Sequence, residues 1–119
     1  MSNPSEALLY YRKEHMVAKE HRLQELVNRA LSDIGRIHVK TRKYKEAITA
    51  FEEKLPICSE SSVERAWLYH DIGRCYLELK ALDKALDLGQ RSASIADDLK
   101  DRRWGMNARL LIAQAYGNY

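Results

Sequence analysis

The chain lacks long apolar runs and is poor in cysteine, proline, glycine and phenylalanine. Its 119 residues include two Cys, two Pro, five Gly and one Phe. No stretch approaches the run of about 18 apolar residues that a membrane-spanning helix needs. The N-terminus also lacks the charged-then-apolar pattern of a secretion signal. We therefore expect neither a membrane protein nor a secreted protein, but one that resides in the cytoplasm.

Residue patterns typical of catalysis are absent as well. The two cysteines, Cys58 and Cys75, do not have the spacing of a zinc site, and His15 and His21 lie six residues apart, so they do not share a helix face. There is no HExxH motif, glycine-rich phosphate loop or nucleophile elbow. The sequence therefore predicts reduced, partly buried thiols, no metal, no cofactor and no enzymatic activity.

A helical pattern dominates the middle of the chain instead. Tyr69, Ile72 and Tyr76 are spaced by three and four residues, so they lie on one face of a helix. Gly73 and Ala85 are small residues on either side of a turn, where two paired helices must cross closely. This stretch predicts a helix, a turn and a second helix packed against the first.

The same pattern recurs along the chain. It appears earlier around Gly35, with Ala47 after a turn at 42–43, and again later around Ala113. The order resembles the tetratricopeptide repeat, and the spacing of about 38–40 residues is slightly longer than the usual period of about 34 residues. The resemblance implies an all-α fold, a right-handed superhelix of antiparallel helix pairs with about six helices.

The repeat divides the chain into one domain of four segments. We assign 1–22 to the second helix of a partial repeat, 24–61 and 62–100 to whole repeats, and 101–119 to the first helix of another. A turn is expected near 21–23. The expected helices cover 6–19, 24–41, 63–79, 82–99 and 103–116, with a further one starting at 43–44.

Three residues carry local expectations. Pro56 removes a backbone donor, so the helix beginning at 43–44 should kink or end soon after it. Ser61 or Ser62 should cap the next helix. Gly89 stands where the earlier repeat has Phe51, which should let a neighbouring helix come closer and weaken its own helix by about 1 kcal/mol.

The last predicted helix has more apolar residues than one neighbouring helix can cover: Leu110, Leu111, Ile112, Ala115 and Tyr116. An uncovered solenoid end normally carries a polar surface. We therefore expect self-association through this C-terminal helix, or contact with another chain.

Charge is nearly balanced, at +3, but basic residues concentrate around the first inter-helix turn, between Arg36 and Lys45. One interpretation is a solvated turn whose cations complement a helix C-terminus. The alternatives are a basic edge for a protein partner and a contact with a phosphate backbone.

The resemblance to tetratricopeptide domains also indicates a binding surface. In that family, ligand contacts commonly come from fixed positions on the first helix of each pair. Here these positions hold Arg29, Ser32, Arg36 and Lys40, then Trp67, His70 and Arg74, then Asn107 and Gln114.

Trp67 with three arginines would suit an acidic segment with an apolar anchor. The alternative is that Trp67 packs between repeats and the arginines only solubilise the surface. Trp104 is interpreted as a packing residue.

A narrower resemblance rests on four segments: NRALSDIGR (28–36), YKEAITAFEEKLP (44–56), WLYHDIGRCYLEL (67–79) and NARLLIAQAY (107–116). Together they resemble the tetratricopeptide subunits of the outer dynein arm docking complex of motile cilia. The resemblance implies a non-enzymatic adaptor in the cytoplasm and the cilium axoneme. Its partners would be docking-complex subunits and dynein-arm components.

Other functions remain open at this point. The chain resembles, more broadly, the long-period repeats of cell-polarity and synaptic scaffolds. It could instead be a cytosolic adaptor that grips an acidic linear peptide in a concave groove. A third hypothesis is a basic helical module on RNA or on the acidic microtubule surface, although we expect no nucleic acid. Phosphate binding would weaken steeply with salt, whereas a groove anchored by Trp67 would not.

Overall fold

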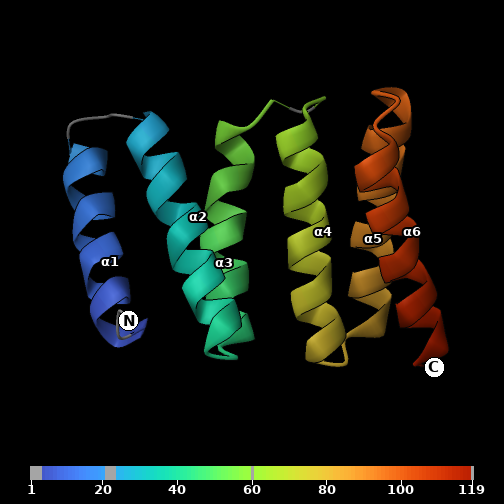
Figure 1. The fold of residues 1–119 in the computed structure, drawn as a ribbon, viewed down its shortest axis with the longest axis horizontal. Helices are drawn as coiled ribbons and strands as arrows, with labels where there is room; N and C mark the ends of the chain where they lie inside the picture. Colours follow the sequence, from blue (N-terminus) through green and yellow to red (C-terminus); the bar gives the residue numbers. More distant parts are fainter. Residues whose placement is uncertain (1–3, 21–23, 60, 119) are drawn as a thin grey trace. The chain divides into compact units, whose positions relative to one another are not determined.

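The computed structural model describes residues 4–20, 24–59 and 61–118, and helix is the only regular secondary structure in these ranges. The all-α prediction is confirmed, whereas the predicted turn near 21–23 lies outside the described residues. None of the described helices is long and apolar enough to cross a membrane. The helices are α1 (Pro4–Glu20), α2 (Gln24–Lys40), α3 (Tyr44–Lys54), the 3₁₀ turn η1 (Leu55–Ile57), α4 (Val63–Glu78), α5 (Leu82–Asp98) and α6 (Arg102–Gly117) (Figure 1).

The chain divides into two compact units, residues 1–57 and residues 58–119, which we call unit 1 and unit 2. The boundary between the units lies a few residues before the repeat boundary expected at 61–62. The predicted division into partial and whole repeats, and the predicted superhelix, stay predictions. Each unit is therefore described by itself.

Unit 1 is a row of three antiparallel helices in which α2 packs against both α1 and α3 (Figure 1). α2 is strongly amphipathic, because its apolar residues recur every three or four positions. The core of the unit contains Leu31, Ile34 and Ala50. Four partly buried side chains pack around it: Leu8, Tyr11, Val27 and Ile57.

At Gly35 a side chain of the neighbouring helix α3 lies against the backbone of α2. A Cβ atom added to Gly35 would stand 2.5 Å from Cε1 of Phe51. Phe51 itself is only 2% exposed. The single phenylalanine of the chain therefore fills the space that the missing side chain of Gly35 leaves between α2 and α3.

The α-helical part of α3 ends at Lys54, two residues before Pro56. Pro56 lies in the middle of η1, where the backbone tightens into a 3₁₀ turn. The sequence placed the end or kink after Pro56, so the structure corrects that boundary. The physical reason is that the proline ring clashes with the carbonyl of the preceding turn as well as lacking a donor.

In unit 2, α5 lies antiparallel to both α4 and α6 and packs against both (Figure 1). One core cluster contains Leu77, Ala85, Leu111 and Ala115, with partly buried Tyr76, Leu82 and Leu86 around it. Ala85 is fully buried, as is its counterpart Ala47 in unit 1. The predicted burial of these two small residues is confirmed, whereas their place at helix crossings stays a prediction.

Two glycines let α6 approach the α4–α5 pair. A Cβ atom at Gly73 would stand 2.7 Å from Cδ2 of Leu111, and one at Gly89 would stand 2.8 Å from Cγ1 of Ile112. Leu111 is 0% exposed as a result. The expectation that Gly89 admits a neighbouring helix is therefore confirmed, and that helix is α6.

Two of the three helix starts in unit 2, those of α4 and α6, are capped by side chains. Ser62 Oγ accepts a hydrogen bond from the backbone N–H of Arg65 at 3.1 Å, which selects Ser62 over Ser61 as the cap of α4. Asp101 Oδ1 accepts one from the N–H of Trp104 at 3.0 Å at the start of α6. Each cap satisfies a donor that has no partner inside its helix.

Three helices end in a left-handed residue that is basic rather than glycine. Arg42, Lys80 and Lys100 have φ angles of 61°, 62° and 57°. At each end a backbone N–H reaches back five residues, as in a Schellman motif. These bonds join Lys43 to His38 (2.7 Å), Ala81 to Tyr76 (2.9 Å) and Asp101 to Ala96 (2.8 Å).

Candidate protein-binding surface

Three of the predicted binding residues on α2 are exposed. Arg29, Arg36 and Lys40 all face solvent. Arg36 lies 3.9 Å from the carboxylate of Asp33, one turn earlier, which is a long and exposed ion pair. These three cations are accessible on unit 1.

Ser32, the fourth predicted residue on α2, is buried. It is 8% exposed, and its hydroxyl donates to the backbone carbonyl of Asn28 at 3.2 Å. The ammonium of Lys54, from α3, donates to the same hydroxyl. Because Lys54 is only 1% exposed, this bond lies inside unit 1. Ser32 thus links α2 to α3 instead of facing a groove.

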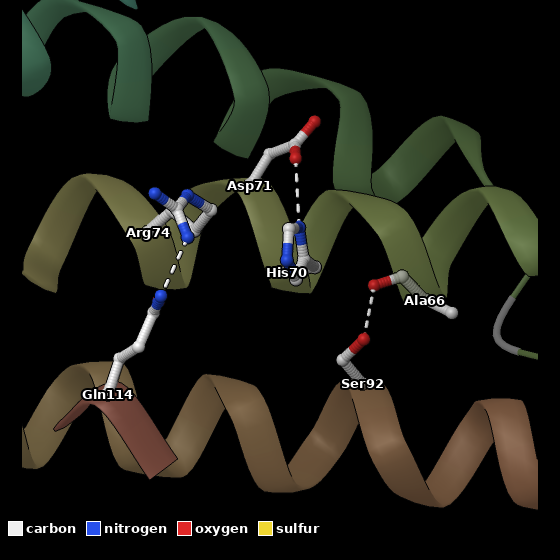
Figure 2. A network of polar contacts seen from close by, with 6 residues as sticks. All are labelled: Ala66, His70, Asp71, Arg74, Ser92 and Gln114. Atoms are coloured by element: carbon white, nitrogen blue, oxygen red, sulfur yellow. Dashed lines mark hydrogen bonds and ion pairs between the residues drawn. The ribbon is translucent and has the colours of Figure 1, made fainter. Parts of the chain in front are cut away.

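The predicted binding residues on α4 differ in their solvent exposure. Trp67 and His70 are half-buried, whereas Arg74 is exposed. The guanidinium of Arg74 donates to Oε1 of Gln114, from α6, at 3.0 Å (Figure 2). Two residues that the sequence predicted separately, on different helices, are therefore in direct contact.

His70 is held from two sides. Its Nδ1 lies 3.1 Å from Oδ1 of Asp71 (Figure 2), and its ring packs edge-on against the indole of Trp104, with centroids 5.4 Å apart. A neutral or charged imidazole can donate from Nδ1 to the carboxylate. Trp104 therefore packs between α6 and α4, as predicted, and fixes the ring of His70.

Asn107 completes the predicted set on unit 2, half-buried on α6. The structure brings together Arg74 and Gln114, and separately His70 and Trp104, on the α4 and α6 helices of one unit. The expectation that Arg36 and Arg74 project side by side concerns residues of different units. It stays a prediction.

A second polar arrangement on unit 1 was not anticipated from the sequence. A cavity of about 190 Å³ opens between the three helices of unit 1. Arg12 donates to Nε2 of His38 at 3.1 Å there, and His15 lies 3.8 Å from Glu53. The cue in the sequence was the interruption of an apolar stripe by His15 and by His38, which both fall on core-facing positions.

Burial shifts the pKa values of two ionisable groups, His38 and Cys75. Burial lowers the pKa of His38, the nearby Arg12 adds to this, and Glu46 opposes it. Burial also raises the pKa of the Cys75 thiol to about 12, with Asp71 adding to the effect. Cys58 and Cys75 are both buried and form no disulfide, in line with the predicted buried thiols.

In the part of the chain that the structure describes, no group of three or more His, Cys, Asp or Glu side chains could hold a metal ion. The chemistry that the surface offers is that of recognition. Exposed guanidinium groups bind carboxylates, and a half-buried indole provides apolar contact.

Comparison with known proteins extends this description. Residues 26–98 match the model of the tetratricopeptide repeat family. The chain is 44% identical over 115 residues to outer dynein arm-docking complex subunit 4 of Danio rerio, which covers 97% of this chain and 24% of that protein. The identity to the proteins of the same name is 44% over 109 residues in Xenopus laevis and 41% over 109 residues in Homo sapiens. These matches cover 92% of this chain but 20% and 16% of the relatives, so the chain spans about a quarter or less of their length.

Proposed function

We propose that this chain, which belongs to the tetratricopeptide repeat family, is a non-enzymatic scaffold that helps dock outer dynein arms onto axonemal doublet microtubules. The support is similarity along nearly the whole chain to proteins named as subunit 4 of the docking complex in several vertebrates. Its partners would be docking-complex subunits and dynein-arm components. Its place would be the cilium axoneme, after synthesis in the cytoplasm.

The observation that best supports a binding surface is the contact between Arg74 on α4 and Gln114 on α6. An exposed arginine normally samples many rotamers, and fixing it on binding costs about 2 kcal/mol of side-chain entropy. The 3.0 Å bond to Gln114 already restricts Arg74 while leaving it exposed. A pre-positioned guanidinium on the same helix as half-buried Trp67 supports recognition of an acidic segment with an apolar anchor.

Unit 1 contributes further cations to this proposal. Arg29, Arg36 and Lys40 are exposed on α2, the helix that matches α4 in the repeat. Ser32 is left out of the proposed contact set, because it is buried against Lys54. The proposed contacts are therefore Arg29, Arg36 and Lys40 on unit 1 and, separately, Trp67, His70, Arg74, Asn107 and Gln114 on unit 2.

The test is capture of the docking-complex subunits and dynein-arm components from ciliated-cell extract, each identified by its own antibody. Replacing Arg36 and Arg74 by Glu should abolish capture while helicity and melting stay unchanged. Trp67→Ala should weaken binding by about 2 kcal/mol if the indole is an anchor. Arg91→Glu is the matched control, since Arg91 is an exposed arginine on α5 that pairs with Asp87 one turn earlier.

Capture that survives the double charge reversal would exclude Arg36 and Arg74 as docking contacts. Failure of the wild-type chain to capture any of the named components would exclude the dynein-arm role itself. Salt separates the nucleic-acid alternative, because binding that releases counterions from a phosphate backbone falls log-linearly with salt concentration. A steep salt dependence that Trp67→Ala leaves unchanged would favour that alternative.

A further inference from the structure

The turn between α2 and α3 carries three exposed cations, Arg42, Lys43 and Lys45, which we call the basic turn. Lys40, in the last turn of α2, adds a fourth exposed cation. Among the residues that the structure describes, the side chains of these four form no hydrogen bond and no ion pair. The next acidic residue along the chain, Glu46, lines the cavity of unit 1. The positive charge of the turn is therefore not neutralised by a salt bridge.

The backbone of the turn does not require these charges, because unit 2 builds the same turn without them. Four hydrogen bonds between a backbone N–H and a carbonyl recur in both units. In unit 1 they join Thr41 to Ile37, Arg42 to Val39, Lys43 to His38 and Ala47 to Lys43, at 2.7 to 3.0 Å. In unit 2 they join Leu79 to Cys75, Lys80 to Leu77, Ala81 to Tyr76 and Ala85 to Ala81, at 2.9 to 3.1 Å.

The charges at the matching positions differ between the two turns. The residues of unit 2 are Lys80 for Arg42, Ala81 for Lys43, Asp83 for Lys45 and Glu78 for Lys40. The four positions thus carry four cations, or +4, in unit 1, and one cation with two carboxylates, or −1, in unit 2. Exposed like charges repel one another. An excess of cations that the fold does not use favours a negatively charged partner.

The exposure of the turn does not depend on neighbouring repeats. Repeats stack through the faces of their helices, and the turns lie at the edge of the stack. The basic turn lies at the shared end of α2 and α3 (Figure 1). Helix pairs packed on either side of unit 1 would therefore leave it accessible.

We propose that the basic turn is a docking site for an acidic, flexible protein segment in which several Asp or Glu residues follow one another. A bilayer is a poorer occupant, because residues 39–46 contain no Leu, Phe or Trp to enter the apolar layer. A nucleic-acid strand is also a poorer occupant, because single strands stack on exposed aromatic faces. Tyr44, the one aromatic residue of this segment, is half-buried.

The site is separate from the contacts of the proposed function, which include Lys40 but none of the three residues of the basic turn. Its test uses a synthetic peptide and changes neither Arg36 nor Arg74. Failure of the dynein-arm docking role would therefore leave the basic turn standing, and failure of the basic turn would leave that role standing.

Fluorescence anisotropy with a labelled decaglutamate peptide tests the site on the whole chain at about 20 mM salt, where exposed charges are weakly screened. The double variant Lys43→Ala/Lys45→Asp gives unit 1 the residues that unit 2 has at these positions, so the turn should still fold. Each exposed ion pair strengthens binding by a factor of about two to five. The variant should therefore bind the peptide about tenfold more weakly.

The matched control is the double variant Arg102→Asp/Arg103→Ala, at two exposed positions of α6. It removes the same three units of positive charge from the chain, because each pair replaces one cation by Asp and one by Ala. Peptide binding should change by less than about twofold. Thermal unfolding followed by circular dichroism checks that both variants stay folded.

Three results with the peptide would overturn the proposal. The first is an absence of binding by the wild-type chain at about millimolar concentration. The second is binding that Lys43→Ala/Lys45→Asp leaves unchanged. The third is an equal loss in both double variants, which would show that only the net charge of the chain matters.

Two further probes distinguish the other occupants. A ten-nucleotide oligouridine and phosphatidylserine vesicles are titrated under the same conditions. Tighter binding of the oligonucleotide than of the peptide, lost in Lys43→Ala/Lys45→Asp but not in the control, would assign the turn to nucleic acid and overturn the proposal. The same pattern with the vesicles would assign it to a membrane surface and overturn the proposal as well.

Discussion

Unit 1 and unit 2 solve the same packing problem with different residues. Gly35 and Gly73 stand at matching positions of the repeat, and each leaves a gap beside its helix. In unit 1 the gap is filled from the paired helix, by Phe51. In unit 2 the residue that matches Phe51 is Gly89, and the gap is filled by Leu111 of the third helix.

The polar links between the paired helices differ in the same way. Lys54 and Ser92 occupy matching positions of the two units, and both are buried. Lys54 donates to the hydroxyl of Ser32, whereas Ser92 donates to the backbone carbonyl of Ala66 at 2.7 Å (Figure 2). Unit 1 thus joins its helices through two side chains, and unit 2 joins α4 and α5 through one short side chain and the backbone.

The comparison teaches that the repeat specifies backbone geometry more strictly than it specifies side chains. The positions of close approach and the left-handed turn recur in both units. The groups that fill the space between helices do not recur. Gly89, which replaces the ring of Phe51, also explains why α6 packs so deeply. Leu111 of α6 occupies the space that the phenylalanine ring fills in unit 1.

The largest expected effect comes from removing the ring that distinguishes unit 1. Phe51→Ala should lower the free energy of unfolding by about 3–5 kcal/mol, because it deletes a buried ring and leaves a cavity beside Gly35. Urea unfolding followed by circular dichroism measures the loss. Tyr10→Ala, at a ring that is 67% exposed, should change stability by less than about 0.5 kcal/mol. A loss below about 1 kcal/mol for Phe51→Ala would show that other groups fill the gap.

Overpacking the shared crossing should affect both units alike. Ala47→Leu and Ala85→Leu each add a branched side chain at a position that is 0% exposed, and each should cost about 1–3 kcal/mol. Thr49→Leu, at an exposed position of α3, is the control. If both alanine variants melt at the wild-type temperature, the alignment of the two units is wrong.

A smaller effect of opposite sign is expected at the shared turns. Arg42→Gly and Lys80→Gly should each stabilise the chain by about 0.5–1 kcal/mol, because glycine adopts a positive φ without a Cβ clash. Equal gains at the two turns would support a shared backbone geometry. Loss of stability in either variant, measured by thermal unfolding, would mean that the basic side chain contributes more than its strain removes.

The smallest difference concerns pH, since it depends on a single imidazole of unit 1. Burial and Arg12 lower the pKa of His38 below 6.5 in the folded chain. Above pH 6.5 the ring is neutral in both states, and its contribution to stability is complete. As the pH falls from 6.5 toward the folded pKa, the unfolded chain takes up the proton first, and stability is lost. Tyr76 stands at the matching position in unit 2.

His38→Gln keeps an acceptor for Arg12 but does not titrate. The wild-type chain should therefore lose stability relative to His38→Gln as the pH is lowered from about 8 to about 5. Urea titrations at several pH values measure the difference. A difference that stays constant over this range would contradict the role of His38.

Most of the fold follows from the sequence, and the reason is periodicity. The helices, their boundaries within a few residues and the burial of Ala47 and Ala85 all depend on the spacing of apolar residues within each helix and on the recurrence of one pattern from repeat to repeat. The sequence states both directly. The kink or end of α3 was expected soon after Pro56, whereas the α-helix ends at Lys54 and Pro56 lies in a 3₁₀ turn, because the proline ring clashes with the preceding turn as well as lacking a donor. The left-handed turns were located, but glycine is the usual signal for that conformation, and Arg42 and Lys80 do not give it.

The candidate protein-binding surface was harder to predict from the sequence. Position in a repeat predicts which helix face a residue occupies, but it does not predict its partner. Ser32 was expected to face a groove and is instead buried against Lys54, a lysine that periodicity alone would place as an ordinary polar residue. The bond between Arg74 and Gln114 depends on side-chain conformations of two helices, which no spacing encodes.

The positions of the two thiols give the molecule a built-in reporter of local opening. Both cysteines of the chain belong to unit 2, and burial raises the pKa of Cys75 to about 12, so reaction with a thiol reagent requires exposure of the thiol first. Labelling at Cys75 therefore proceeds at the rate at which the α4 region opens. Cys75 lies on α4 of unit 2, so comparing its labelling kinetics with hydrogen exchange in unit 1 would reveal whether the two units unfold as one cooperative block or as two.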